Sequence, residues 1–445
     1  MRIAILSSLY QPHCFGGAER IAQRIAEGLA RQGHEVLVVS LDPRANAPLE
    51  RINGVNVARI RLPNLYWPFP HTNQSQLTKL GWHAIDHWNP IAAGRARREI
   101  ERFGPELVQT HNLVGFSTAV WPMLQRMGVP IVHVIHDYYL LCVNSTMMHA
   151  GVCHDGQHGW CRYARALQRN HSAAVGTVVG VSQFVLDTHL RAGLFPNAAI
   201  RRVINNGYDS PPAQPGILGR STPFHQAGRL TIGFLGKLSE VKGLRPLLSA
   251  VARLSQERVS LLIAGDGEES FVNQLKTDFP SPNIRFLGKV DAAAFFGQLD
   301  VLCVPSIWND PHPSVVFEAF AHGVPVVGSR AGGITEMMED GVSGVLVPPG
   351  DPQALADALT KFVDRPDALT AMRSAALEKA QRFTVSRNLT AYARLLDDVM
   401  ALRRGSASGL EREQRVPGSS RADPIDFAHA VSAHRDAQPV DTLTS

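Results

Sequence analysis

The 445-residue sequence has no apolar run of the roughly eighteen residues needed to cross a bilayer, so we expect no transmembrane helix. Its first residues, MRIAILSSLY, contain one arginine and a short apolar stretch, which is typical of a first strand and not of a secretion signal. The five cysteines are few and odd in number. Without a secretion signal, this favours reduced thiols and a cytoplasmic location.

The composition is that of a globular chain, with 44% hydrophobic and 19% charged residues. A chain of this length exceeds one ordinary domain, so we expect two domains and a tail. The net charge of +5 suggests anionic partners such as phosphates or a membrane surface. We expect no nucleic-acid partner.

Two stretches follow the same strand–loop–helix–strand order, one at residues 1–42 and one at residues 230–265. Strands such as VSLLIAG and LDVLCVPS are continuously apolar, as expected when helices cover both faces of a parallel sheet. The pattern predicts an α/β protein with two Rossmann-like doubly wound domains. Neither unit contains G-x-G-x-x-G, which argues against a dinucleotide oxidoreductase.

The predicted organisation has five parts: an N-terminal Rossmann-like domain at 1–210, a linker at 211–228, a C-terminal Rossmann-like domain at 229–386, a closing helix at 387–404, and a tail at 405–445. The tail is polar, rich in Pro and Ser, and without hydrophobic periodicity, so we expect it to be disordered.

Ligands of such sheets bind beyond the carboxyl ends of the strands. There, GKLSEVKG carries Lys237 and Lys242, whose ammonium groups can bind phosphate. PHPSVVFEAF predicts a helix with Ser314 as its N-cap and the amides near Val315 and Val316 facing the ligand, an arrangement suited to an anion. Taken singly, each feature is as well explained by solvated lysines or an ordinary helix cap.

Gly16 and Gly17 in GGAER allow a ligand to approach the backbone of the first domain closely, although an ordinary turn would use them too. In WNDPHPSVVFEAF, Asp310 follows a predicted strand and Glu318 lies within the next helix. The prolines between them exclude a shared helix, so the two carboxylates are not a surface pair. Together these features predict a cleft between two domains, lined by cations and amides and facing a diphosphate.

The motifs GFLGKLSEVKG, NNGYD, IAGDGEE and WNDPHPSVVFEAFAHGVPVVGSRAGGITEMMEDGVSGVLVPPGD resemble the donor-binding half of family 4 glycosyltransferases, which are retaining enzymes of the GT-B fold. GGAER, THNL, HDYYLLC and VSQFVLDTHL in the first half are similar to a bacterial branch that assembles surface polysaccharide. The resemblance covers about residues 1–400 and leaves out the tail.

The resemblance implies that Asp310 faces the hydroxyls of the donor sugar and that Glu318 binds the ribose of the nucleotide. It also implies that Lys237 and Lys242 stabilise the leaving diphosphate. Two positions depart from the family pattern: Asp310 occupies a position where the family has Glu, and Lys237 occupies one where it has Arg. No Asp-x-Asp triplet is present, which agrees with catalysis without a metal, and we expect no cofactor.

The resemblance places His111 in QTHNL near the reacting sugar. His136 ends the following strand, where a structural role is nearly as well supported as a role in the site. A retaining double displacement needs a nucleophile, and we find no clear candidate. We therefore favour attack on the same face, with the diphosphate as base.

Two further features remain open. Cys142, Cys153 and Cys161 lie among histidines and could hold a structural zinc, although no C-x-x-C is present. Basic clusters could contact anionic lipid, or could simply be solvated helix faces; they are Arg95, Arg97 and Arg98, and Arg162, Arg165 and Arg169.

The sequence leaves three interpretations. The first is a glycosyltransferase that uses a nucleotide diphosphate sugar and a glycan or lipid-linked acceptor. The second is a sugar-nucleotide epimerase of the same architecture. The third is a non-catalytic subunit with a decayed site, which Asp310 and Lys237 would favour and which Glu318, Lys242 and NGYD oppose.

Overall fold

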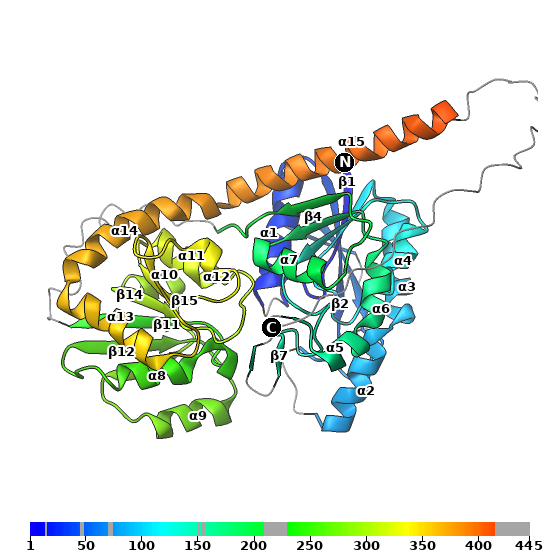
Figure 1. Cartoon of the computed structure of the whole chain (residues 1–445). Helices are drawn as coiled ribbons and strands as arrows, with labels where there is room; N and C mark the ends of the chain where they lie inside the picture. The colour runs from blue at the N-terminus through cyan, green and yellow to red at the C-terminus, as the bar shows by residue number, and fades with distance from the viewer. Residues whose placement is uncertain are drawn as a thin grey trace, which may run out of the picture. The chain divides into compact units, whose positions relative to one another are not determined.

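The fold is described from a computed structural model (Figure 1). The structure describes residues 1–13, 16–44, 49–69, 74–149, 152–153, 156–208 and 229–413. The predicted linker at 211–228 and most of the predicted tail, residues 414–445, lie outside this part of the chain.

The first domain is built on an eight-stranded sheet in the order β10-β9-β6-β5-β1-β2-β4-β3. Neighbouring strands are parallel except for β3 and β4. The strands are β1 (Arg2–Leu6), β2 (Glu35–Asp42), β3 (Glu50–Ile52), β4 (Val55–Arg61), β5 (Leu107–Thr110), β6 (Ile131–Ile135), β9 (Thr177–Gly180) and β10 (Ile200–Val203). Figure 1 shows helices flanking this sheet.

Helices of the first domain form where apolar residues recur at helical spacing. In α1, Ile21, Ile25 and Leu29 fall on one buried face. The helices are α1 (Gly17–Arg31), α2 (Gln76–His87), α3 (Pro90–Phe103), α4 (Val120–Gln125), α5 (Gly159–Ala164), α6 (Ala166–Ser172) and α7 (Gln183–Arg191). A hairpin of β7 (Met148–His149) and β8 (Val152–Cys153) precedes α5.

The second domain has a six-stranded, fully parallel sheet in the order β13-β12-β11-β14-β15-β16. Along β12, Leu261 and Ile263 pack into the core beneath α8 and α13, whereas Leu262 and Ala264 pack into the core beneath α10 and α11. This alternation follows the period of two of a strand and explains why the strand is apolar throughout.

The strands of the second sheet are β11 (Leu230–Leu235), β12 (Val259–Ala264), β13 (Ile284–Gly288), β14 (Val301–Val304), β15 (Val326–Ser329) and β16 (Gly344–Val347). Its helices are the 3-10 turn η2 (Glu240–Lys242), α8 (Leu244–Val251), α9 (Glu269–Asp278), α10 (Ala292–Phe296), α11 (Ser314–Ala321), α12 (Ile334–Met337), α13 (Pro352–Asp364), α14 (Pro366–Ala380) and the 3-10 turn η3 (Gln381–Phe383).

The long helix α15 (Val385–Glu413) follows. Its residues Tyr392, Leu395, Leu396 and Val399 join the hydrophobic core of the first domain. The helix runs past the predicted end at residue 404, so the first residues of the predicted tail are helical. Residues 405–413 contain two glycines and two serines, which disfavour helix, but the remaining Ala, Leu, Glu and Arg residues favour it, and no proline interrupts the segment before Pro417. Residues 1–400 form one compact unit, and a second begins at Ala401.

The prediction of two Rossmann-like domains is confirmed. Among the residues that the structure describes, none of the helices combines the length and apolarity that crossing a membrane requires. Both parallel sheets end in loops that carry the predicted site residues, and these loops meet: Tyr138 Oη, after β6, donates to the Asn309 carbonyl oxygen, after β14, at 2.7 Å.

Candidate active site

An ion pair between Lys242 and Asp310 lies at the centre of the second domain's loops. Lys242 ends η2, Asp310 follows β14, and Nζ lies 2.5 Å from Oδ2. Asp310 is 4% exposed, and the Lys242 ammonium also lies 5.3 Å from the centre of the Trp308 ring. The structure thus brings together a cation and a carboxylate that the sequence separates by 68 residues.

Two glycines that the sequence analysis did not single out hold the Asp310 loop in place. The Gly333 amide donates to the Asp310 carbonyl oxygen at 2.8 Å, and the Gly332 amide donates to Asn309 Oδ1 at 3.2 Å. A Cβ atom at Gly333 would lie 1.9 Å from the Pro311 carbonyl oxygen. Two adjacent glycines, which follow the apolar strand β15 after Arg330 and Ala331, were the available signal for such a close approach.

The start of α11 differs from the prediction, and Ser314 is not its N-cap. Pro313 occupies that position, because its extended backbone and φ of −65° direct the chain into the helix, and Ser314 is the first helical residue. The Val316 amide donates to the Pro313 carbonyl oxygen at 3.2 Å and therefore does not face a ligand. The amides of Ser314 and Val315 lie in the first turn, where the helix supplies no acceptor.

Glu318 and Lys237 lie on either side of this centre in the sequence and differ in exposure. Glu318 is half-buried in the second turn of α11. Lys237, after β11, is exposed at the surface. Partial loss of water around its ammonium lowers the pKa of Lys237, and the charge of Asp266 opposes this effect.

In the first domain, His111 and His136 form a stacked, hydrogen-bonded pair. His111 Nδ1 lies 2.8 Å from His136 Nε2, and the ring centres are 5.1 Å apart. Burial lowers the pKa of His136 to about 4 and that of His111 well below its usual value, so both rings are neutral at pH 7. Neutral imidazoles can donate or accept hydrogen bonds here but do not supply positive charge.

A small pocket opens beside this pair and is lined by residues of β6 and the two loops after β5 and β6. They include His111, Asn112, His136, Asp137, Tyr139 and Leu140. His111 Nε2 is buried and has no hydrogen-bond partner in the described part of the chain. Burial raises the pKa of Asp137 to about 6.

The glycines of GGAER stand at the start of α1, with Gly16 as the N-cap and Gly17 as the first helical residue. A Cβ atom at Gly16 would lie 2.5 Å from Glu19 Oε2, whereas one at Gly17 would meet no atom within 4 Å. Gly17 therefore borders open space and Gly16 makes room for Glu19. Burial raises the pKa of Glu19, another residue that the sequence analysis did not single out.

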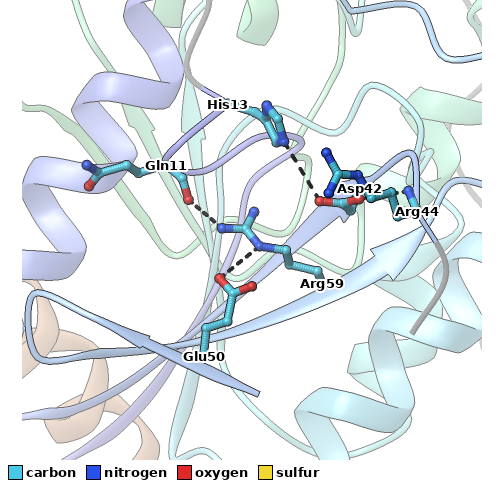
Figure 2. A network of polar contacts seen from close by, with 6 residues as sticks. All are labelled: Gln11, His13, Asp42, Arg44, Glu50 and Arg59. Atoms are coloured by element: carbon cyan, nitrogen blue, oxygen red, sulfur yellow. Dashed lines mark hydrogen bonds and ion pairs between the residues drawn. The ribbon is translucent and has the colours of Figure 1, made fainter. Parts of the chain in front are cut away.

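A polar network fixes the loop that leads into GGAER (Figure 2). The Arg59 guanidinium, on β4, donates to the Gln11 carbonyl oxygen and to Glu50 Oε2, the latter at 3.1 Å. Asp42, at the end of β2, accepts from the Arg44 amide at 2.7 Å and lies 3.9 Å from His13 Nε2. The loop after β1 is thus tied to β4 through Arg59 and to β2 through Asp42, and Glu50 of β3 holds the Arg59 side chain.

The two cysteines Cys142 and Cys161 are buried, with their Sγ atoms 3.9 Å apart. The side chain of Cys153, the third predicted zinc ligand, lies outside the described part of the structure. Within the described residues, no group of three or more His, Cys, Asp or Glu side chains could hold a metal ion.

One residue of the predicted lipid-binding clusters is not available to a surface. Arg165 is 4% exposed, and its guanidinium lies over the Tyr139 ring at 4.7 Å. It follows α5 and faces inward because the short helices α5 and α6 meet there. Arg95 and Arg97 are half-buried and bonded to the Arg61 carbonyl oxygen and to Glu101.

Sequence comparisons agree with this architecture. The family description "Glycosyltransferase Family 4" matches residues 15–210, and "Glycosyl transferases group 1" matches residues 229–365. A 42.6 kDa protein from the cps region of Klebsiella pneumoniae is 30% identical over 343 residues, which are 76% of this chain and 87% of the relative. D-inositol 3-phosphate glycosyltransferase of Saccharomonospora viridis is 29% identical over 68% of this chain and 72% of that protein.

Solved structures show the same fold. HepE of Anabaena, crystallised with UDP, has a TM-score of 0.64 and 21% identity, and the match covers 89% of this chain and all of HepE. Sucrose-phosphate synthase of Thermosynechococcus elongatus has a TM-score of 0.71 and 20% identity, over 90% of this chain and 99% of that enzyme.

The two Rossmann-like domains and the loops in which they meet define a protein of the GT-B fold class. Within that class, the chain belongs to glycosyltransferase family 4.

Proposed function

We propose that the protein is a retaining hexosyltransferase that moves a sugar from a nucleotide diphosphate donor to a hydroxyl of a glycan or lipid-linked glycan. The observation that carries the proposal is the Lys242–Asp310 pair, held beside the start of α11. A cation, a carboxylate and two helix amides at one place suit a donor that carries a diphosphate and a sugar.

In this proposal the donor's diphosphate replaces Asp310 as the partner of Lys242. The ammonium groups of Lys242 and Lys237 and the amides of Ser314 and Val315 stabilise the charge that develops on the leaving group. Asp310, released from the ion pair, accepts hydrogen bonds from the donor sugar, and Glu318 binds the ribose.

The transfer step proceeds on one face of the sugar. The bond between the anomeric carbon and the diphosphate oxygen breaks, and a bond forms from the same carbon to the acceptor oxygen. The acceptor proton passes to the departing diphosphate, so net retention needs no enzyme nucleophile. His111 and His136, both neutral, orient hydroxyls beside the pocket. Lysines and amides take the place of a metal.

The similarity to a protein of a cps region supports a role in surface polysaccharide assembly. The proposal places this reaction in the cytoplasm, at the inner face of the cell membrane. HepE has been solved with UDP and with UDP-glucose, so these are the first ligands to test. The test is incubation with UDP-glucose and a lipid extract in the presence of EDTA. We expect UDP release that depends on the extract, and a product with the anomeric configuration of the donor.

Other outcomes would favour one of the two alternative functions. Conversion of a nucleotide sugar into an isomer without any acceptor would indicate an epimerase. A protein that neither converts nor binds any nucleotide sugar would be a non-catalytic subunit. Asp310 in place of the family's Glu and Lys237 in place of its Arg are the features that support this alternative.

A further inference from the structure

The loop after β6 places a carboxylate in the pocket beside His111 and His136. Asp137 lines this pocket and directly follows His136 at the end of β6. Its Oδ1 accepts from the Tyr139 amide at 2.8 Å, and its Oδ2 has no hydrogen-bond partner among the described residues. The backbone therefore orients the carboxylate and leaves one of its oxygens for a ligand.

A buried imidazole nitrogen of the same pocket also lacks a partner. His111 is 2% exposed, and its Nδ1 lies 2.8 Å from His136 Nε2. Its Nε2 has no hydrogen-bond partner in the described part of the chain. A buried polar atom without a partner lowers stability, and a ligand that supplies the partner would remove this cost. His111 is therefore a second contact for a ligand, independent of the carboxylate.

A second carboxylate acts on Asp137. Glu19, on α1, is 5% exposed and accepts from the side-chain nitrogen of Asn112, a residue of the pocket, at 3.4 Å. Burial raises the pKa of Asp137 to about 6, and the charge of Glu19 adds to this effect. The exposed Arg20 acts on Glu19 in the opposite sense, but water screens its charge. The two carboxylates thus repel each other beside the pocket.

The lining of the pocket supplies no positive charge. Among the residues that the structure describes, neither a lysine nor an arginine lines it. Its histidines are His111, His133 and His136, and burial lowers the pKa of each so far that all three are neutral at pH 7. Asp137, with a pKa of about 6, is mostly ionised at that pH. The described lining therefore carries a net negative charge.

One arginine acts on Asp137 without lining the pocket. Arg165 is 4% exposed, and its guanidinium lies 4.7 Å from the centre of the Tyr139 ring. Tyr139 Oη donates to Asp86 Oδ2 at 2.8 Å, and the charge of Arg165 acts on Asp86 as well as on Asp137. This cation is therefore shared between two carboxylates, and burial still raises the pKa of both. The pocket keeps its acidic character.

An acidic pocket suits hydroxyl groups and not anions. A hydroxyl can donate to Asp137 Oδ2, and it can bond with His111 Nε2 whichever nitrogen of that neutral ring carries the proton. A phosphate or a carboxylate is anionic at pH 7, and its charge would meet that of Asp137 in a partly buried place where water screens little. The loops of the second domain carry Lys237 and Lys242 and offer the opposite charge to the donor.

We propose that Asp137, with Glu19 behind it, selects the acceptor: the pocket binds an uncharged sugar by its hydroxyls and excludes a sugar that carries a phosphate or a carboxylate. Asp137 Oδ2 accepts from one acceptor hydroxyl, and His111 Nε2 bonds with a second. Both are hydroxyls other than the reacting one, whose proton passes to the diphosphate. The inference rests on the proposed function and names the chemical class of the acceptor end that enters the pocket.

The test uses pairs of probes that differ in charge alone: methyl glucoside with methyl glucuronide, and methyl galactoside with methyl galacturonide. Their Kd values for the full-length protein are measured by saturation-transfer NMR. Wild type should bind the uncharged member of at least one pair about tenfold or more tightly than the charged member. Asp137→Asn should lose most of this preference, because the charged probe binds more tightly once the repulsion is gone and the amide oxygen still accepts from a hydroxyl.

Two further variants complete the comparison. Glu19→Gln leaves Asp137 in place and should shift the preference in the same direction by a smaller factor, so the test stands even if Asp137→Asn is unstable. Glu101→Gln removes an exposed carboxylate at the end of α3 and is the matched control. It should keep the wild-type preference.

Equal binding of charged and uncharged probes by wild type, binding of no probe, or an unchanged preference in both variants would overturn the proposal. So would weaker binding of both members of a pair in Asp137→Asn, which would indicate a structural role. Calorimetric titration with nucleoside diphosphates on the same samples reports the donor site separately. A protein that binds a nucleotide but shows no preference between probes refutes acceptor selection alone. One that prefers uncharged probes but binds no nucleotide refutes the proposed function alone.

Discussion

At the scale of single residues, Lys242 has two competing partners: the Asp310 carboxylate that it contacts in this structure and the diphosphate of the proposed donor. In Asp310→Asn the competing charge is gone, so UDP should bind as tightly as to wild type or more tightly. Turnover should nevertheless fall about 100-fold or more, because the sugar loses its carboxylate. Lys242→Met should weaken UDP binding at least about tenfold.

Calorimetric titration with UDP, followed by the transfer assay on the same preparations, separates these two effects. If Asp310→Asn weakened UDP binding as strongly as Lys242→Met does, the proposal that the diphosphate replaces Asp310 as the partner of Lys242 would be wrong.

A second residue-scale prediction compares two glycines. Gly333→Ala places a Cβ 1.9 Å from the Pro311 carbonyl oxygen, so the Asp310 loop must move. We expect a loss of roughly 1–3 kcal/mol in the free energy of unfolding. Gly17→Ala meets open space at the first position of α1 and should change stability by less than about 0.5 kcal/mol. Urea denaturation of the two variants is the measurement, and equal losses would contradict it.

At the scale of elements, α7 of the first domain is capped by a side chain from the second. The Glu336 carboxylate, on α12, accepts from the Gln183 amide at 2.7 Å and from the Phe184 amide at 2.6 Å. A carboxylate at a helix N-terminus contributes about 1 kcal/mol. Glu336→Ala should therefore speed hydrogen exchange at these two amides, while Glu336→Gln should do so less.

Glu339→Ala removes another acidic side chain of the same region and is the matched control for that exchange experiment. Unchanged exchange in Glu336→Ala would show that the cap contributes nothing in solution.

Some elements of the fold could be predicted from the sequence, and some of the contacts between them could not. The two βαβ units, β14 and α11 follow from continuous apolar runs and helical spacing, and the loops that carry Asp310, Lys242 and His111 follow from parallel topology. Contacts such as Tyr138 with Asn309 or Glu336 with Gln183 join residues more than 150 positions apart, and nothing local encodes them. The predicted cap at Ser314 differs from the observed cap at Pro313 because the restricted φ of proline sets the start of α11 without any side-chain hydrogen bond.

At the scale of the whole molecule, buried histidines set the response to acid. Burial lowers the pKa of His111, His133, His136, His189 and His312, so the folded protein takes up fewer protons than the unfolded chain below pH 6.5. The buried histidines therefore cost no stability above pH 6.5, and the free energy of unfolding falls as the pH drops toward 4. Three buried acids oppose this trend but are fewer than the histidines: burial raises the pKa values of Asp86 and Asp137 to about 6 and also raises the pKa of Glu19.

The midpoint of thermal unfolding should accordingly fall between pH 7 and pH 5. Burial lowers the pKa of His189 to about 4, so this one imidazole should reduce the free energy of unfolding by on the order of 2 kcal/mol at pH 5 relative to neutral pH. His189→Asn should make the pH dependence shallower, whatever it does to stability at pH 7. A midpoint that rises on acidification would contradict the account.

The most direct test of the central claim, that the loops of the second domain bind a nucleotide diphosphate sugar, is thermal shift against a panel of nucleoside diphosphates and their sugar conjugates. A nucleotide at about a hundred times its Kd should add roughly 2.7 kcal/mol to the free energy of unfolding, which raises Tm visibly. The account predicts that at least one nucleotide stabilises the wild type and that Glu318→Ala loses this effect. No stabilisation across the panel, or equal stabilisation of Glu318→Ala, would contradict it.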